Sequence, residues 1–257
     1  MYKERWNFPH VLGSLDGKHV RIMRPPGGGS RYYNYKGFHS VILMAVANGN
    51  YEFSYIQVGA EGHHADGGVW SSTKFHRLMM KPNNPLGIPT PSRITPGGDV
   101  VPFFLVADEA FGLDPNVLRP FGGRHLPARE RLFNYRLSRA RRVVENAFGI
   151  LGQRFRILMK CMDNHPKTVQ RMVHAMCILH NFLRRRSPNF YMPRGTYDEE
   201  HEDGSYTPGS WRREPTMTSL RAMGYRKSTG YARDLRVYLA NYFESPSGTV
   251  PWQWDSL

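Results

Sequence analysis

Continuous and alternating apolar runs divide the first part of the chain into short strands. Residues 37–46 (GFHSVILMAV) are almost uninterrupted in their apolar character, which is typical of a strand buried on both faces. Strand-forming residues resume at 51–59 after an Asn-Gly-Asn turn. Because Asn-Gly favours a tight turn between antiparallel strands, we predict a hairpin here. A shorter apolar run at residues 11–17 ends in the turn signal Asp-Gly.

Apolar residues recur at helical spacing in two later segments. The first segment, residues 137–158, carries such a stripe at Val144, Phe148, Leu151 and Phe155. The second segment, residues 167–184, repeats it at Val169, Met172, Val173, Met176, Leu179 and Leu183. We therefore predict two long amphipathic helices. Residues 67–80 and 231–243 are expected to form shorter ones.

Residues 100–106 (VVPFFLV) form a further apolar run that leads directly into an Ala-Asp-Glu sequence. The run predicts a buried strand whose first residues are edge-like, because Pro102 cannot donate a hydrogen bond to a neighbouring strand. Loops are predicted from composition at residues 81–99 and 113–130. The order of hairpin, helix, strand and helices predicts an α/β fold with a mixed sheet flanked by helices.

The charge of the chain adds a functional indication. Its 257 residues contain 35 Lys and Arg against 21 Asp and Glu, which gives a net charge of +14 and a sequence pI of about 10.0. Such an excess attracts polyanions, because each neutralised phosphate releases condensed counterions. An ordinary basic soluble protein is the alternative. An anionic membrane surface is a weaker one, since no basic amphipathic helix lies beside an anchor.

The sequence also bears on the compartment. No run approaches the roughly 18 apolar residues of a membrane span, and the N-terminus has no apolar signal segment. The two cysteines, Cys161 and Cys177, are expected to be buried thiols in a reducing compartment and not a disulfide scaffold. With the positive charge, this favours the nucleus, and the cytoplasm is the alternative.

Four carboxylates stand out by their position in this order of elements. Asp16 ends the first strand, Asp108 follows the strand at 100–106, Glu145 lies within a long helix, and Asp66 follows the hairpin in a Gly-rich segment. Phosphodiester cleavage needs a stabilised phosphate and an activated water, which two Mg²⁺ or Mn²⁺ ions about 3.5–4 Å apart supply. Carboxylates from strand ends and a packed helix suit such hard cations.

Each of these residues also has an ordinary structural explanation, which for Asp66 is that a Gly-rich loop commonly contains an aspartate. The first aspartate is part of a turn sequence, and the aspartate after the later strand is suited to capping the next segment. Glu145 is placed for an ion pair with Arg141 or Arg142 on its helix. His63 and His64 lack a matching Cys or His at fixed spacing, so polar loop residues are the favoured interpretation over metal ligands.

Basic residues cluster around the start of the first long helix, interleaved with aromatic ones. The cluster contains Arg129, Arg131, Arg136, Arg139, Arg141 and Arg142. A solvated helix face explains part of it. Beside an acidic metal site we favour a track for DNA phosphates, with Arg136, Arg139, Arg141 and Arg142 as the contacts.

Six blocks of the sequence, in order, resemble the conserved segments of DDE transposases of the Harbinger superfamily. They are residues 15–20 (LDGKHV, similar to IDGTHI), 32–40 (YYNYKGFHS, YxNRKGxxS), 59–70 (GxxxDxxVF), 107–113 (ADEAFGL, GDSGYPL), 133–155 (FNxxxSxxRxxIExxFGxLKxRF) and 175–183 (AxxxLHNxL). The resemblance implies an RNase H-like fold. It also implies that Asp16, Asp108 and Glu145 match the DDE triad, and that Asp66 matches a further proposed metal ligand.

The resemblance covers residues 6–185, which we predict to be a metal-dependent nuclease or transposase domain. Residues 187–226 are rich in Ser, Pro, Gly and acidic residues without periodicity, and are predicted to be a flexible linker. A helical tail at residues 227–257 follows. Proteins of this family are thought to use a Myb-like partner for DNA targeting, so DNA and such a partner are the expected ligands.

The chain departs from the family pattern around its second catalytic aspartate. Residues 107–111 are ADEAF where the family has GDSGY, so that Glu109 adds a negative charge beside Asp108. The helical region that usually precedes the first catalytic strand is missing, as expected of a fragment or a truncated copy. Two functions are therefore left open: an active nuclease, or a domesticated or decayed transposase that binds DNA without catalysis.

Overall fold

The computed structural model describes residues 1–64, 66–201, 203–220 and 228–255. Its centre is a mixed sheet with the strand order β3-β2-β1-β6-β7, in which β10 pairs with β1 beside this path. The strands are β1 (Val11–Arg21), β2 (Ser40–Ala47), β3 (Phe53–Glu61), β6 (Phe104–Val106), β7 (Val117–Leu118) and β10 (Thr218–Ser219). β1 to β3 are antiparallel neighbours, whereas β6 runs parallel to β1 and β7 parallel to β6. This α/β arrangement is consistent with the predicted RNase H-like fold.

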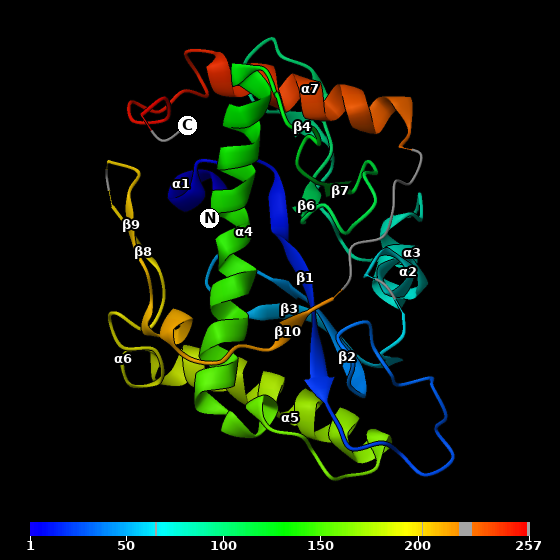
Figure 1. The fold of residues 1–257 in the computed structure, drawn as a ribbon. Helices are drawn as coiled ribbons and strands as arrows, with labels where there is room; N and C mark the ends of the chain where they lie inside the picture. Colours follow the sequence, from blue (N-terminus) through cyan, green and yellow to red (C-terminus); the bar gives the residue numbers. More distant parts are fainter. Residues whose placement is uncertain (65, 202, 221–227, 256–257) are drawn as a thin grey trace.

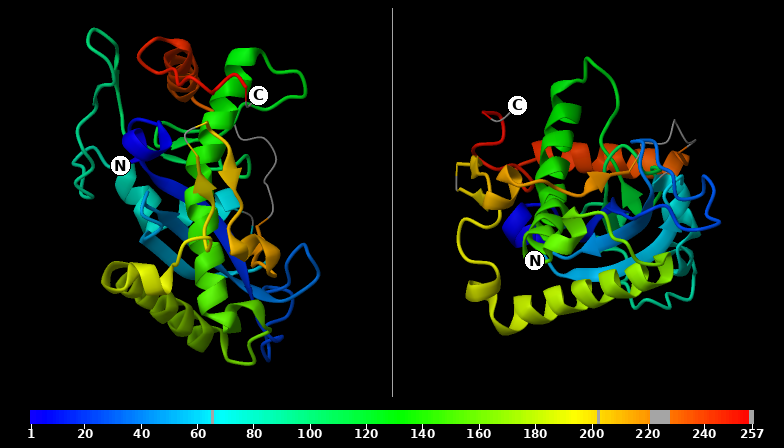
Figure 2. Two further views of the ribbon diagram at one scale, coloured as in Figure 1. Left: turned by 90° about the vertical axis from the view of Figure 1, so that its left-hand side faces the viewer. Right: turned by 60° about the horizontal axis from the view of Figure 1, so that its bottom comes forward.

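Helices surround this sheet (Figures 1 and 2). They are α1 (Tyr2–Trp6), α2 (Asp66–Ser72), α3 (Lys74–Met79), α4 (Ala128–Arg154), α5 (Pro166–Arg186), α6 (Pro188–Tyr191) and α7 (Gly230–Glu244), with the 3-10 turns η1 (Arg156–Met159) and η2 (Ser210–Arg213). Short pairs of strands, β4 (Ser92–Arg93) with β5 (Val100–Val101) and β8 (Glu199–Glu200) with β9 (Tyr206–Thr207), lie outside the sheet. Within the described ranges, no helix has the length and apolarity that crossing a bilayer requires.

Two hydrophobic cores lie on opposite faces of the sheet. In β2, Val41, Leu43 and Ala45 contribute to the core that contains residues of α4, α5 and α7. Ile42 and Met44 contribute to the other core, which contains residues of α2 and α3. This alternation follows from the two-residue period of a strand, and it explains why every residue of β2 is buried.

Most of the predicted elements are confirmed, with shifted boundaries. The hairpin of β2 and β3 and the helices α5 and α7 form where the sequence predicts them. The predicted strand at residues 100–106 is instead two short strands, because Pro102 and Phe103 interrupt it and β5 pairs with β4 while β6 joins the sheet. The first long helix begins at Ala128, and the predicted loop at 113–130 contains β7.

The segment predicted to be a flexible linker contains regular structure in the part that the structure describes. Residues 187–220, apart from the undescribed position 202, contain α6, β8, β9, η2 and β10. Asp198, Trp211 and Met217 in this segment are buried. The sequence pattern missed this because a few isolated side chains, without helical or strand periodicity, anchor the segment. Residues 221–226, also assigned to the linker, lie outside the described residues.

Candidate active site

The middle of β1 provides the first carboxylate. Residues 11–14 of β1 pair with β6, whereas Lys18 and His19 pair with β10 on the same edge. Asp16 lies between these two partners, in the interior of β1 and not at its end as the sequence predicted. Because strand side chains alternate, Asp16 shares a face with Ser14, whose hydroxyl donates a hydrogen bond to the carbonyl of Ala140 in α4 at 2.7 Å. Asp16 therefore faces α4.

The end of β6 brings a second carboxylate to the first. Asp108 follows β6 by two residues, and its Oδ1 accepts a hydrogen bond from the Ala110 amide at 2.9 Å. Burial raises the pKa of Asp108, and the negative charge of Asp16 raises it further, while the charges of Arg141 and Lys18 act in the opposite direction. The two aspartates are thus close enough to repel each other when both are ionised.

Basic side chains contact the carboxylates of this region. Glu145, in α4, accepts hydrogen bonds from Arg141 at 2.8 and 2.5 Å, and Arg212 lies 3.4 Å from its other oxygen. Asp16 forms an ion pair with Lys18, whose Nζ lies 2.8 Å from Oδ2. The ion pair that Glu145 was expected to form as an ordinary helix residue is therefore present. Glu145 forms this ion pair and also lies beside the other two carboxylates.

Asp16, Asp108 and Glu145 line one cavity of about 250 Å³. Its other walls are Lys18, Arg141, Phe148, Gly149, Trp211, Arg212, Thr216, Met217 and Ser219. A larger cavity of about 680 Å³, beside α1 and β8, contains none of the three carboxylates. The three side chains surround their cavity without converging. In the part of the chain that the structure describes, no choice of one oxygen from each carboxylate brings all three within 4.8 Å of one another.

The donor set of this cavity suits a hard divalent cation. Three carboxylates supply only oxygen ligands, as Mg²⁺ and Mn²⁺ prefer, and they are held on a sheet and a packed helix. The raised pKa of Asp108 adds a second reason, because a cation beside Asp16 and Asp108 would relieve their repulsion. Residues and site therefore fit such an ion.

The comparison with known protein families covers these same residues. A family model described as "DDE superfamily endonuclease" matches residues 15–181, well over half of the chain. The chain belongs to the DDE superfamily endonucleases. The match contains Asp16, Asp108 and Glu145 and ends before Trp211 and Arg212, so part of the cavity wall lies outside it.

A curated relative of this DDE-family chain is "Protein ALP1-like" from Arabidopsis thaliana. The two are 26% identical over 181 residues, which is 68% of this chain and 43% of the relative. The chain therefore spans less than half of the length of that protein. No solved structure matches the chain.

Asp66 is only partly placed by the structure. It is the first residue of α2, in the stretch that follows β3. Its side chain lies outside the part of the chain that the structure describes. Its role as an additional metal ligand in this DDE-family chain stays a prediction.

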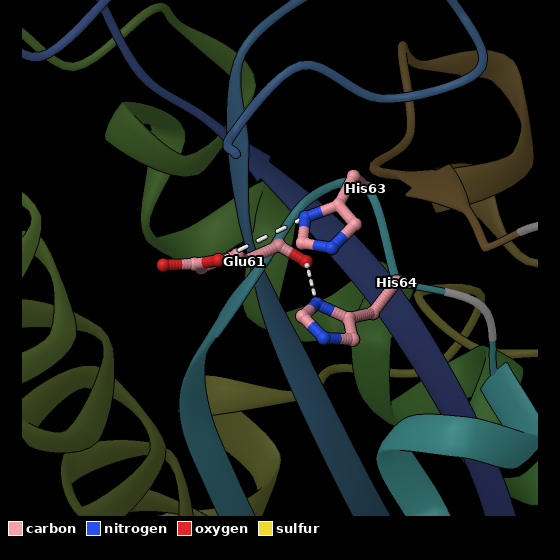
Figure 3. A group of neighbouring side chains, drawn as sticks. All are labelled: Glu61, His63 and His64. Carbon is pink, nitrogen blue, oxygen red and sulfur yellow. Dashed lines mark hydrogen bonds and ion pairs between the residues drawn. The ribbon is translucent and has the colours of Figure 1, made fainter. Parts of the chain in front are cut away.

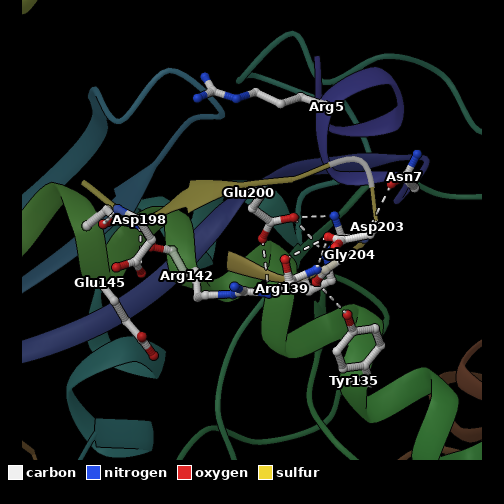
Figure 4. A network of polar contacts seen from close by, with 12 residues as sticks. Arg5, Asn7, Tyr135, Arg139, Arg142, Glu145, Asp198, Glu200, Asp203 and Gly204 are labelled. Atoms are coloured by element: carbon white, nitrogen blue, oxygen red, sulfur yellow. Dashed lines mark hydrogen bonds and ion pairs between the residues drawn. The ribbon is translucent and has the colours of Figure 1, made fainter. Parts of the chain in front are cut away.

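Three of the four arginines predicted to bind DNA are buried and have partners within the protein. Arg136 donates hydrogen bonds to Gln253 and to backbone carbonyls, and is 1% exposed. Arg139 and Arg142 both form ion pairs with Glu200 of β8 (Figure 4). The prediction of a phosphate track is therefore wrong for these three, because α4 turns this face toward the C-terminal segments and not toward solvent.

The cavity residues that the sequence reasoning missed include Lys18, Trp211 and Arg212. Lys18 follows the first aspartate by two positions, so the strand period already placed both side chains on one face. Trp211 and Arg212 lie in the segment predicted to be a linker, and only their long-range contacts identify them. Trp211 packs directly on Gly149, where a Cβ atom would lie 2.2 Å from the indole, and its Nε1 donates to Asn146 at 2.7 Å.

Proposed function

We propose that this chain carries a divalent-metal-dependent DNA nuclease of the Harbinger transposase type. The observation that carries the proposal is the shared cavity of Asp16, Asp108 and Glu145, which come from three separate blocks of the Harbinger resemblance and lie within the family match. No single one of these carboxylates would support it, since each also has an ordinary structural role. A basic net charge of +14 is consistent with a polyanionic substrate.

The proposal assigns each carboxylate a role. Asp16 and Asp108, the pair that repel each other, would hold Mg²⁺ or Mn²⁺, and Glu145 would complete the ligand set from α4, with Asp66 assisting. When bound, the ions would stabilise charge on the scissile phosphate and activate the attacking water or DNA 3′-hydroxyl. The side chain of Arg141 orients Glu145 by its two hydrogen bonds.

Metal-dependent nicking of supercoiled plasmid DNA tests this function. The wild-type chain should nick in Mn²⁺ and not in chelator, and Asp108→Asn should lower the rate by at least about 100-fold, because a metal ligand is lost. Glu109→Gln is the matched control, since Glu109 is exposed and adjacent in sequence. Equal rates in wild type and Asp108→Asn would assign the nicking to a contaminant and overturn the proposal.

A second candidate function is DNA binding without catalysis on the same scaffold. It is favoured by the basic side chains that already neutralise the carboxylates, namely Lys18, Arg141 and Arg212. It predicts that the chain retards DNA in a gel equally with Mn²⁺ and with chelator, and that no nicking accompanies binding. The plasmid assay therefore separates the two candidates.

We also propose that the chain acts in the nucleus and receives its target specificity from a Myb-like DNA-binding partner. Both follow from the Harbinger resemblance and the positive charge. Imaging of a fluorescent fusion tests the compartment. Copurification with Myb-like proteins encoded in the same genome tests the partner, and an exclusively cytoplasmic signal would contradict the first.

A further inference from the structure

A second group of potential ligands lies at the far end of β3. Glu61 is the last residue of β3, and His63 and His64 follow it in a turn (Figure 3). One ligand atom from each of the three residues lies within 4.8 Å of the others. Among the His, Cys, Asp and Glu side chains that the structure describes, this is the group of three that meets this distance.

The hydrogen bonds of the two imidazoles determine which nitrogen is available. Nδ1 of His63 lies 2.6 Å from the carbonyl oxygen of Arg31, and Nδ1 of His64 lies 3.1 Å from the carbonyl oxygen of Glu61. A carbonyl oxygen only accepts hydrogen bonds, so each Nδ1 must carry the proton. In the neutral rings Nε2 then has a free lone pair. Metal-binding histidines in proteins are oriented in the same way, by a backbone or carboxylate acceptor on the other nitrogen.

The carboxylate of Glu61 is also only partly engaged. Its Oε1 lies 3.4 Å from the guanidinium of Arg31, while Oε2 faces His63 with 3.8 Å to Nδ1. The side chains of Glu61 and His63 are 26% and 47% exposed, so they can shift at little cost. Ligands 2.0–2.1 Å from a tetrahedral ion lie about 3.4 Å apart. The group therefore closes around an ion when these exposed side chains rotate to present Nε2 of each ring to the carboxylate of Glu61.

The backbone holds this turn close to the loop that contains Arg31. The Gly62 backbone is so close to its neighbours that a Cβ atom there would lie 2.3 Å from the Ser40 hydroxyl and 2.5 Å from the Tyr32 carbonyl oxygen. The amide of His63 donates to the Arg31 carbonyl at 3.3 Å. The two histidines are thus attached to a fixed backbone, and their side chains alone need to adjust.

We propose that Glu61, His63 and His64 bind a transition-metal ion of the Zn²⁺ class, at a site distinct from the carboxylate cavity. Two imidazoles and one carboxylate form a ligand set that binds such ions in preference to Mg²⁺ or Ca²⁺, and the fourth coordination position is left for water. The strand register separates the sites: Glu61 pairs with Val41 and Val41 with Val20, four residues from Asp16 along β1. This corresponds to roughly 16 Å between the backbone positions.

Calorimetric titration with Zn²⁺, in the presence of excess Mg²⁺, tests the site. Wild type should bind one Zn²⁺ per chain at this site, and His63→Ala or His64→Ala should weaken binding by at least about tenfold. The double variant should lose that equivalent. His125→Ala, a change at an exposed histidine elsewhere, is the matched control and should leave the affinity unchanged.

Two further measurements keep the test independent of the proposed nuclease function. Asp108→Asn should bind Zn²⁺ at the new site as wild type does, whether or not the protein nicks DNA. Co²⁺ bound to Asp108→Asn should give the visible absorption bands of a four-coordinate site. Adding His63→Ala to this variant should remove these bands. Absence of Zn²⁺ binding by wild type, or an unchanged affinity in the double histidine variant, would overturn the proposal.

Discussion

The two candidate metal sites of this molecule are built in opposite ways. The carboxylate cavity takes its ligands from β1, from Asp108 just after β6, and from α4. These segments are far apart in sequence and meet in the centre of the fold. The site of Glu61, His63 and His64 takes all its ligands from four consecutive residues at the end of one strand. The first is coupled to folding through the core, whereas the second needs only a local turn.

Charge compensation also differs between the two sites. In the cavity, Asp16 and Glu145 are neutralised by the basic residues Lys18, Arg141 and Arg212, so that a metal must compete with ion pairs. At the turn, the imidazoles keep a lone pair free because backbone carbonyls accept their other protons. This comparison predicts that substitutions around the cavity change stability strongly, and that those at the turn change metal affinity alone.

The largest effect is expected at Asp198, which anchors the cavity wall. Its carboxylate is 1% exposed and accepts hydrogen bonds from Arg212 at 2.8 and 2.6 Å, from the Gly209 amide at 2.9 Å and from Asn146 at 3.3 Å. Asp198→Ala should lower the free energy of unfolding by about 3 kcal/mol, because buried partners lose their acceptor. Urea denaturation measures this. Asp203→Ala, at an exposed aspartate nearby, should stay within about 0.5 kcal/mol of wild type.

The fold was predictable to the extent that periodicity carries it. The continuous apolar run of β2 and the helical spacing of apolar residues in α5 each define the type of the element without tertiary information. The split of residues 100–106 was only partly predictable, since Pro102 was recognised as a defect in the strand but not as its interruption. The segment of residues 187–220 was not predictable, because single anchors such as Trp211 leave no period.

Replacing Lys18 should have the next largest effect on stability. It also tests whether a metal ion can take the place of the lysine ammonium beside Asp16. Its Nζ lies 2.8 Å from Asp16 and 2.7 Å from the Ser219 hydroxyl, and the side chain is 12% exposed. Lys18→Met should cost about 2 kcal/mol without metal, because Asp16 keeps an uncompensated charge. Mn²⁺ should then raise the melting temperature of the variant more than that of wild type. Equal increases would place Mn²⁺ away from Asp16.

The candidate site was predicted in its acidic residues but not in its surroundings. The blocks around Asp16, Asp108 and Glu145 are local in sequence, so motif spacing identified them. The burial of Arg136 was not predictable, since a basic residue on an amphipathic helix is usually exposed and only the docking of Gln253 against it reverses that expectation. Long-range packing decided the roles of these arginines.

A smaller effect is expected from relieving the repulsion within the cavity. Folding raises the pKa of Asp108, so the folded state holds its proton more tightly, and stability is lost as pH rises from the unfolded value of about 3.9 through the folded one. Asp108→Asn removes both this loss and the repulsion with Asp16. In chelator, the variant should melt higher than wild type, by a margin that grows as the pH rises above about 4. A margin independent of pH would contradict the repulsion.

The smallest change in stability is expected at the turn, where the two sites should differ most. His64 is exposed, and both its imidazole and its backbone amide hydrogen-bond to the carbonyl of Glu61, a residue three positions away. Without added metal, His64→Ala should therefore change the free energy of unfolding by less than about 0.5 kcal/mol. With Zn²⁺, wild type should gain stability in proportion to the logarithm of the ion concentration, whereas the variant should gain much less. Denaturation at several Zn²⁺ concentrations measures both slopes. A large loss without metal would mean that this turn, like the cavity, is coupled to the core, and the contrast between the two sites would then fail.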